Sequence, residues 1–250
     1  MKSTILSVCT LTCLLFASST SMKAGDEPKM VVGVSVGAGL PMGAYGSTAK
    51  LAAGDTTHVN GFASMGFHFN VNAGYYFMDN VGAMLQIGGN MNGFNMAAYK
   101  TTYNVPSSST ATATSYYVGS YLVGPTLRFP IGDKLGFSAR VLVGLMTVKS
   151  TKWTDTYTVL GTTYTTNDYY SSASTFGYNI GAGLKYNLTD KMGLGLNIDY
   201  LGGSPNFTTE NHTVSPTNSF DPNSTSGGHK RNMSTSLLNI SLGFTVGFGS

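Results

Sequence analysis

Charged residues are scarce in this 250-residue chain, where Asp, Glu, Lys and Arg together make up only 10% of the sequence. Ordinary globular domains carry about 25%, so the chain is short of the side chains that usually cover a water-facing surface. The net charge of +3 is small and spread along the chain, which gives no indication of a nucleic-acid partner. This composition does not suit an ordinary water-soluble domain.

Cysteine is almost absent, because the chain has 2 cysteines and both lie within residues 1–22. That segment has the layout of a secretory signal peptide: Lys2, then an apolar run over 5–17, then small residues that predict cleavage near 19–24. The apolar run is shorter than the roughly 20 residues of a membrane-spanning helix. The mature chain is therefore expected to lack disulfides and thiol chemistry. No later stretch stays apolar long enough to predict a transmembrane helix.

Glycine and aromatic residues are plentiful, with 32 Gly, 15 Tyr and 13 Phe, and they follow an alternating pattern that is clearest at the C-terminus. Between residues 238 and 248 every even position is apolar: Leu238, Ile240, Leu242, Phe244, Val246 and Phe248. Every odd position there is small or polar. Since successive side chains of a strand point to opposite faces, the pattern predicts a strand with one apolar face and one thin, uncharged face. Alternation alone does not decide between a soluble and a membrane strand.

Seven further segments alternate in the same way and complete a predicted set of eight strands. The eight predicted strands cover residues 30–40, 62–77, 81–92, 116–129, 135–149, 174–187, 192–201 and 238–248. Their lengths suffice to cross a bilayer in a tilted orientation, which takes about 9–11 residues. Pro125 falls on the apolar face in the middle of its strand and predicts a bulge or a register offset there.

The connections alternate regularly in length, and this asymmetry is the most informative feature of the chain. Short turns are expected at 78–80, 130–134 and 188–191, and long loops at 41–61, 93–115, 150–173 and 202–233. Outer-membrane barrels have short periplasmic turns and long extracellular loops. The sequence therefore predicts an all-β fold over residues 30–250: an eight-stranded antiparallel up-and-down transmembrane β-barrel with three short periplasmic turns and four long extracellular loops. Both termini are expected to be periplasmic, and the last strand is expected to pair with the first.

The predicted outward face supports a lipid environment, because none of the eight strands places a charge on it. Aromatic residues collect near both strand ends, as expected for two interfacial girdles. At the turn end these are Tyr75, Phe77, Phe129, Phe137, Tyr186 and Phe248. At the loop end they are Phe62, Tyr117, Tyr121, Phe176, Tyr178 and Tyr200.

With its strands placed, the chain resembles the eight-stranded outer-membrane β-barrel proteins of the OmpA-, OmpX- and OmpW-like group, including the small barrels of Bacteroidetes. The resemblance is carried by residues 31–37, by 72–77 and by the C-terminal strand. It implies an outer-membrane location in a Gram-negative bacterium and recognition of the last strand by the barrel-assembly machinery. Phe248 is followed by Gly249 and Ser250, whereas the family pattern ends on an aromatic residue.

The predicted inward face carries the candidate site residues, which are His68, Asn70, Gln86, Arg128, Arg140, Lys185 and Asp199. One interpretation is a hydrogen-bonded polar interior, because an eight-stranded barrel is just wide enough for its side chains to fill it. The other is a narrow passage that prefers anions. The three cations fall in the turn-proximal half while Asp199 lies toward the loop end, so we expect the acid to be distant. Water, loop residues, Asp133 or Asp190 would then balance the cations.

No catalytic residue, cofactor or metal site is predicted. His58, His212 and His229 lie in expected loops without the tight spacing of a metal site, and no Ser/His/Asp arrangement stands out. The loops are rich in Tyr, Thr, Ser and Asn, which suits either surface contact or a hydrophilic cap.

The sequence thus predicts a monomeric, non-catalytic outer-membrane barrel with a structural or adhesin-like surface-interaction role. Its expected partners are outer-membrane lipid, the barrel-assembly machinery and a possible extracellular ligand, with no nucleic acid. The main alternative is a narrow small-solute channel. Less favoured are a soluble lipocalin-like carrier and a lipid-modifying enzyme.

Overall fold

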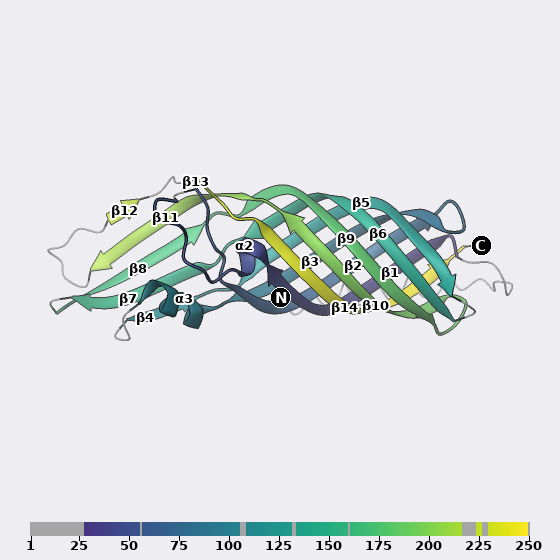
Figure 1. Ribbon diagram of the computed structural model, residues 1–250, viewed down its shortest axis with the longest axis horizontal. Helices are drawn as coiled ribbons and strands as arrows, with labels where there is room; N and C mark the ends of the chain where they lie inside the picture. The colour runs from purple at the N-terminus through teal and green to yellow at the C-terminus, as the bar shows by residue number, and fades with distance from the viewer. Residues whose placement is uncertain are drawn as a thin grey trace, which may run out of the picture.

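The computed structural model describes residues 28–55, 57–105, 109–131, 134–159, 161–216, 224–226 and 230–249. The predicted signal peptide, His229 and Asp133 lie outside these residues. Eight long strands form a closed barrel in the order β1-β14-β10-β9-β6-β5-β3-β2, tilted across its long axis (Figure 1). They are β1 (Met30–Met42), β2 (Ala63–Tyr76), β3 (Val81–Phe94), β5 (Tyr116–Ile131), β6 (Leu135–Lys149), β9 (Ala173–Asn187), β10 (Met192–Gly203) and β14 (Thr235–Phe248). The predicted eight-stranded antiparallel barrel is therefore confirmed.

The barrel closes by pairing its last strand with its first, as the sequence predicts. Met30 lies opposite Phe248 and Leu40 opposite Leu238 in an antiparallel ladder without a register shift. The strands are staggered around the barrel. Starting at Gly39 on β1 and stepping from each residue to its cross-strand partner on the next strand, the path passes around the barrel to Tyr76 on β2. The Tyr76 N–H donates to the carbonyl of Lys29, just before β1, at 2.7 Å. The path returns to the first strand ten residues away from its start. Such a stagger requires strands that are strongly tilted to the barrel axis.

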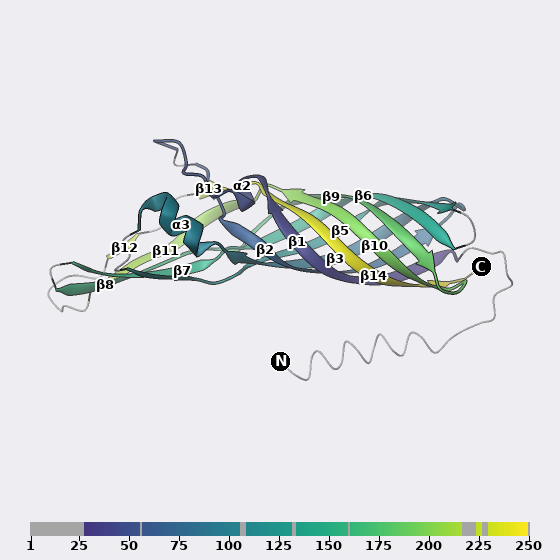
Figure 2. The ribbon, with the colours of Figure 1, turned by 60° about the horizontal axis from the view of Figure 1, so that its bottom comes forward.

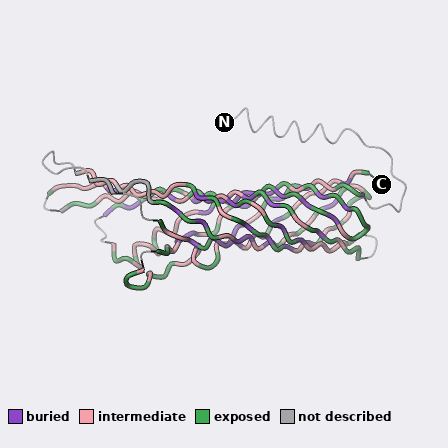
Figure 3. Tube along the Cα trace, turned by 90° about the horizontal axis from the view of Figure 1, so that it is seen from above, coloured by how far each residue is buried: buried purple, intermediate pink, exposed green. Residues whose placement is uncertain are grey.

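Buried and exposed residues alternate along most of the barrel wall, as the purple and green segments of the trace show (Figure 3). Outward residues such as Val36, Leu85 and Leu242 are exposed and apolar, while the intervening small and polar residues face the interior. The predicted charge-free outer face needs one correction at its edge. Lys149, the last residue of β6, is exposed, and its Nζ lies 5.8 Å from the ring centroid of outward-facing Tyr117. A lysine at a strand end can reach the polar boundary of an apolar band.

Two predictions of local register are wrong. Pro125 causes neither a bulge nor an offset, because the β5–β6 ladder keeps the same register on both sides of it. Phe62 does not join the aromatic girdle, since it precedes β2 and is buried. Its φ of 49° is in the left-handed region, which is a genuine outlier for a bulky residue. This backbone conformation breaks the strand alternation before residue 63.

The three short connections lie at one end of the barrel, together with the start of β1 and the end of β14; we call it the turn end and the opposite end the loop end. A second sheet extends from the loop end (Figures 1 and 2). It runs β12-β11-β8-β7-β4, and β13 pairs with β11. The elements at this end are α2 (Gly43–Gly46), α3 (Met96–Tyr103), β4 (Thr110–Ala113), β7 (Lys152–Val159), β8 (Thr162–Tyr170), β11 (Asn206–Pro216), β12 (Ser224–Ser226) and β13 (Lys230–Asn232).

The expectation that residues 93–115, 150–173 and 202–233 are loops is therefore wrong. In β7 and β8 the strand face is held by cross-strand pairs, which are the unit of sheet stabilisation. Thr154 Oγ1 donates to Asn167 Oδ1 at 2.7 Å, and the rings of Tyr157 and Tyr164 stack with centroids 5.5 Å apart. Thr and Tyr are good strand formers, but a sheet that is polar on both faces shows no apolar alternation. The sequence pattern therefore gave no strand signal here.

Candidate functional site

A buried ion pair crosses the middle of the barrel interior. Arg140 Nε donates to Asp199 Oδ1 at 2.8 Å and Arg140 Nη2 donates to Oδ2 at 2.5 Å. The side chains are 7% and 0% exposed. Arg140 lies on β6 and Asp199 on β10, and each is register partner of Gly181 on the intervening strand β9. Because Gly181 has no side chain, the guanidinium reaches across it to the carboxylate.

This pair corrects the expectation that Asp199 is distant from the cations. Depth in a tilted barrel follows the hydrogen-bond register and not the number of residues from a strand end. The register brings Arg140 and Asp199 to the same level although their strands are not neighbours. Asn197 Oδ1 also accepts from Nη1 and Nη2 of Arg140, at 3.3 and 3.4 Å. The guanidinium is therefore held by three oxygens.

A chain of amides and one imidazole continues along the interior face of β2 and β3. His68 Nδ1 lies 3.2 Å from Asn90 Oδ1, and His68 Nε2 lies 3.2 Å from Asn70 Nδ2. Asn72 Nδ2 donates to Asn70 Oδ1 at 3.2 Å. His68, Asn70 and Gln86 are all buried. The structure buries all three side chains, as the sequence predicts, and the contacts of His68 and Asn70 have the form of a hydrogen-bonded polar interior.

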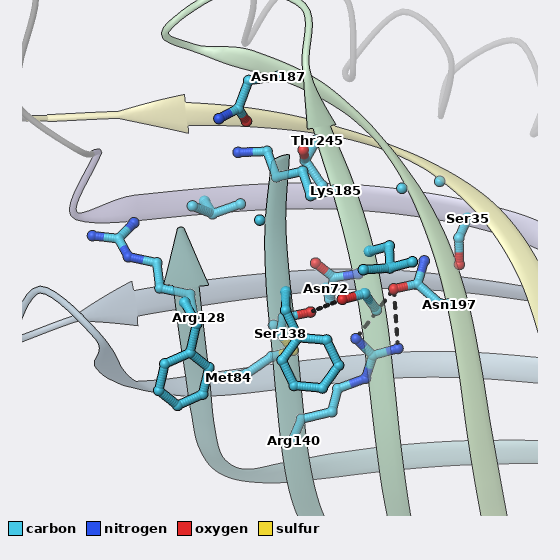
Figure 4. A pocket seen from close by; sticks show the side chains of 18 of the residues that line it. Ser35, Asn72, Met84, Arg128, Ser138, Arg140, Lys185, Asn187, Asn197 and Thr245 are labelled. Atoms are coloured by element: carbon cyan, nitrogen blue, oxygen red, sulfur yellow. Dashed lines mark hydrogen bonds between the residues drawn. The ribbon is translucent and has the colours of Figure 1, made fainter. Parts of the chain in front are cut away.

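The turn end of the interior holds a cavity of about 100 Å³ that is lined by all three predicted cations, Arg128, Arg140 and Lys185. Figure 4 shows these side chains projecting from different strands around the cavity. Arg128 is anchored to the turn-end backbone: its Nε donates to the carbonyl of Asp79 at 2.6 Å and its Nη1 to that of Pro28 at 2.8 Å. Its guanidinium carbon lies 4.0 Å from the ring centroid of Tyr76.

The loop half of the interior contains a large apolar cluster, which the sequence analysis did not predict. Inward-facing positions of four strands, β5, β6, β10 and β14, carry large side chains that are at most 2% exposed: Val118, Leu122, Leu142, Met146, Leu201 and Leu237. They pack in one cluster with Tyr45, Tyr116, Phe207 and Met233 from the loop-end segments. This apolar layer fills the barrel between the polar interior and the second sheet.

A larger cavity, of about 480 Å³, lies above this layer at the loop end. Its aromatic lining consists of Phe62, Phe94, Tyr99, Tyr103, Tyr116, Trp153, Tyr170 and Phe207. Tyr99 lies at the centre of the cluster, with ring centroids 4.9 Å from Tyr103 and 5.9 Å from Trp153. Helix α3 presents Tyr99 and Tyr103 to the cavity. The side chain of Asn95 caps the start of this helix by accepting from the Ala98 N–H at 3.0 Å.

The lining of the aromatic cavity includes one acidic residue, Asp168, and one basic residue, Arg231. Asp168 Oδ2 accepts from Trp153 Nε1 at 2.8 Å, which fixes the indole plane. Arg231 also lines the cavity, and its Nε is buried without a hydrogen-bond partner among the described residues. Burial, helped by the charge of Asp155, raises the pKa of Tyr99 to about 12, so its phenol stays neutral. The site has the form of a ligand pocket, which is typically apolar with a few convergent polar groups.

Sequence reasoning missed this cavity entirely. Its lining comes from segments expected to be loops, namely β7, β8, β11 and α3, plus the misplaced Phe62. The one available signal was the single tryptophan of the chain, which lies among tyrosines in an expected loop. Within the described residues, no cluster of three or more His, Cys, Asp or Glu could hold a metal ion. In the same part of the chain, no helix combines the length and apolarity that a membrane span requires.

No curated protein matches this chain. Similar solved structures include Neisserial surface protein A, with 12% identity over 88% of this chain and 97% of that chain and a TM-score of 0.46. Ail, the attachment invasion locus protein of Yersinia pestis, is 14% identical over 87% and 99%, with a TM-score of 0.39. The outer membrane protease OmpT from Escherichia coli is 8% identical over 92% and 100%, with a TM-score of 0.46.

A family model described as "outer membrane protein beta-barrel domain" matches residues 9–248, which is nearly the whole chain. This agrees with the closed eight-stranded barrel and its apolar outer surface. The chain therefore belongs to the outer membrane protein β-barrel domain family and is an outer-membrane protein.

Proposed function

We propose that this protein is a monomeric, non-catalytic barrel whose role is ligand contact at the cell surface. The observation that carries the proposal is the contrast between the two ends of the interior. The apolar layer occupies the loop half of the barrel lumen, whereas an aromatic cavity of about 480 Å³ lies beyond it at the loop end. This volume is within the range of about 300–1,000 Å³ that is usual for small-molecule sites.

The orientation that this role requires has the loop end outside the cell and both termini in the periplasm. Bacterial outer-membrane barrels carry short periplasmic turns and longer extracellular loops. Here the three short connections and both ends of the barrel chain share one end, and the second sheet extends from the other. In this orientation β14, which ends at Phe248, is the strand offered to the barrel-assembly machinery. The predicted signal peptide over residues 1–22 would direct export of the chain to the periplasm.

The lining of the aromatic cavity favours a small ligand with a flat or apolar body and one or two polar groups. Aromatic faces supply contact area, and Asp168 and Arg231 supply opposite charges for orientation. The ligand's own charge would decide which of the two it meets. A carboxylate suits the guanidinium of Arg231, and an ammonium suits Asp168 and the aromatic rings.

Trp153 provides a direct test, because it is the single tryptophan of the chain and lines the cavity. The protein in neutral nanodiscs is titrated with benzoate and with benzylamine while tryptophan emission is recorded. We expect saturable quenching by at least one probe and a loss of about tenfold in its affinity in Tyr99→Ala. Tyr157→Ala is the matched control, since Tyr157 stacks on Tyr164 in the same sheet and does not line the cavity. Absence of saturable quenching by both probes would contradict the proposal.

The narrow channel is the second candidate, and the cationic turn-end cavity is the observation that favours it. Leu122, Leu142 and Leu237, each at most 1% exposed, stand between that cavity and the loop end. We therefore propose that the protein does not conduct. Planar-bilayer recordings of the refolded protein are expected to show no unitary conductance. Reproducible openings that become less anion-selective in Lys185→Gln would instead support the channel.

A further inference from the structure

A third cavity, of about 440 Å³, lies at the loop end where β5, β6, β7 and β8 approach one another. It is lined by Thr114, Ser115, Tyr117, Lys149, Ser150, Lys152, Tyr169, Tyr170, Ser171 and Ser172; we call it the rim pocket. Tyr117 belongs to the exposed aromatic residues at the loop-end border of the apolar surface. The rim pocket therefore lies at the level where the apolar band gives way to polar surface.

The rim pocket is cationic. Lys149 Nζ lies 5.8 Å from the ring centroid of Tyr117, and Lys152 Nζ lies 5.3 Å from that of Tyr169. In each case the lysine and the tyrosine are direct cross-strand partners. The described residues that line the pocket include no Asp or Glu. The two ammonium groups are thus positioned over aromatic faces and lack a lining carboxylate.

The backbone of Lys152 is held by reciprocal hydrogen bonds with Thr114. The Thr114 N–H donates to the carbonyl of Lys152 at 2.9 Å, and the Lys152 N–H donates to Thr114 Oγ1 at 2.8 Å. Serine hydroxyls at 115, 150, 171 and 172 complete the lining. Two ammonium groups and several hydroxyl donors around one cavity are chemically suited to a phosphate group.

We propose that the rim pocket binds the phosphate of a membrane lipid headgroup. Lysines at the edge of an apolar band extend to the polar boundary, where headgroups lie, and aromatic residues mark the same level. Basic side chains at a membrane surface attract anionic lipids with about 1 kcal/mol per residue. The rim pocket shares Ser150 and Tyr170 with the aromatic cavity, but its two lysines do not line that cavity. Lipid binding at the rim pocket requires only that the barrel spans a bilayer.

The test uses native mass spectrometry of the full mature barrel in a neutral maltoside detergent, which makes binding independent of orientation in a membrane. Phosphatidic acid supplies the phosphate on a lipid, diacylglycerol supplies the same chains without it, and inorganic phosphate supplies the free anion. We expect retention of phosphatidic acid over diacylglycerol. Lys149→Gln and Lys152→Gln should each weaken it about fivefold, and the double variant about 25-fold.

Lys230→Gln is the matched control, because Lys230 is exposed at the same end and does not line the rim pocket. Lys149→Arg keeps the charge and is expected to retain binding, which separates loss of charge from loss of fold. The proposal is overturned if the double variant stays within about twofold of the parent, or if diacylglycerol is retained equally well. It is also overturned if inorganic phosphate displaces the lipid at equal concentration, since the ligand would then be the free anion.

Discussion

The ion pair inside the barrel allows a quantitative prediction for Asp199→Asn. The substitution leaves the guanidinium of Arg140, only 7% exposed, without its counter-charge. Two charge-assisted hydrogen bonds are lost or weakened, each worth about 1.5–3 kcal/mol, and breaking a buried pair typically costs about 3–5 kcal/mol. The remaining acceptor on Asn197 and the adjacent turn-end cavity both ease the desolvation of Arg140. We therefore expect a loss of about 3 kcal/mol in the free energy of unfolding.

The assay is equilibrium unfolding by denaturant in lipid vesicles, followed by far-UV circular dichroism for the barrel strands. Tryptophan emission reports separately on the loop-end sheet, because Trp153 is the only tryptophan. The control is the double variant Arg140→Met/Asp199→Leu, which removes both charges and is expected to recover most of the loss. A loss below about 1 kcal/mol for Asp199→Asn, with no coupling in the double-mutant cycle, would refute the reasoning.

Three further predictions concern single positions. Gly181→Ala places a methyl group against the ion pair, 2.9 Å from Arg140 Nε, and should cost about 1–3 kcal/mol by the same assay. Gly195→Ala, which meets only ordinary contacts at 3.6 Å and beyond, should cost much less; equal losses would contradict this account. Burial, and to a lesser extent the neighbouring carboxylate of Asp168, raises the pKa of Asp155. The negative charge of Asp155 therefore destabilises the fold increasingly as the pH rises from about 3.9, the usual pKa of an aspartate, to the raised pKa of the folded state. Asp155→Asn should then raise the loop-end unfolding midpoint at neutral pH, measured by tryptophan emission, but not at acid pH, and an equal gain at both would argue against a charge effect. Val143→Arg, on the exposed face of β6, should cost about 2–4 kcal/mol in a bilayer, and an unchanged free energy of unfolding would place that face outside the lipid.

The barrel could be predicted from sequence because two local signals agree along the whole chain. Strict alternation assigns each side chain to a face, and short turns fix the register of the hairpins they connect. The turn at 188–191, for example, sets β9 against β10 and so places Asp199 opposite Gly181. The short connection between β5 and β6 likewise places Arg140 opposite Thr126.

The ion pair could not be predicted because it depends on a register that no short turn fixes. β6 and β9 are joined through the β7–β8 hairpin, so the sequence does not show that Arg140 lies opposite Gly181. A shift of one residue between β6 and β9 would have exchanged the inward and outward faces, which the sequence pattern would reveal. A shift of two residues would have kept the alternation while separating the two charges. The alternating pattern therefore cannot distinguish registers that differ by two residues. Depth within the barrel therefore required the structure.

The order of layers along the interior has a functional consequence. Cations lie at the turn end, the ion pair and amides at the centre, and the apolar layer at the loop end. Water that enters from the turn end can thus reach Arg140, which makes a buried charge tolerable, but it meets Leu142 and Leu237 beyond. Phe207 and Met233 belong both to this apolar layer and to the lining of the aromatic cavity. A ligand in that cavity is therefore expected to tighten the packing between barrel and second sheet, and so to strengthen the closure of the barrel and not to open it.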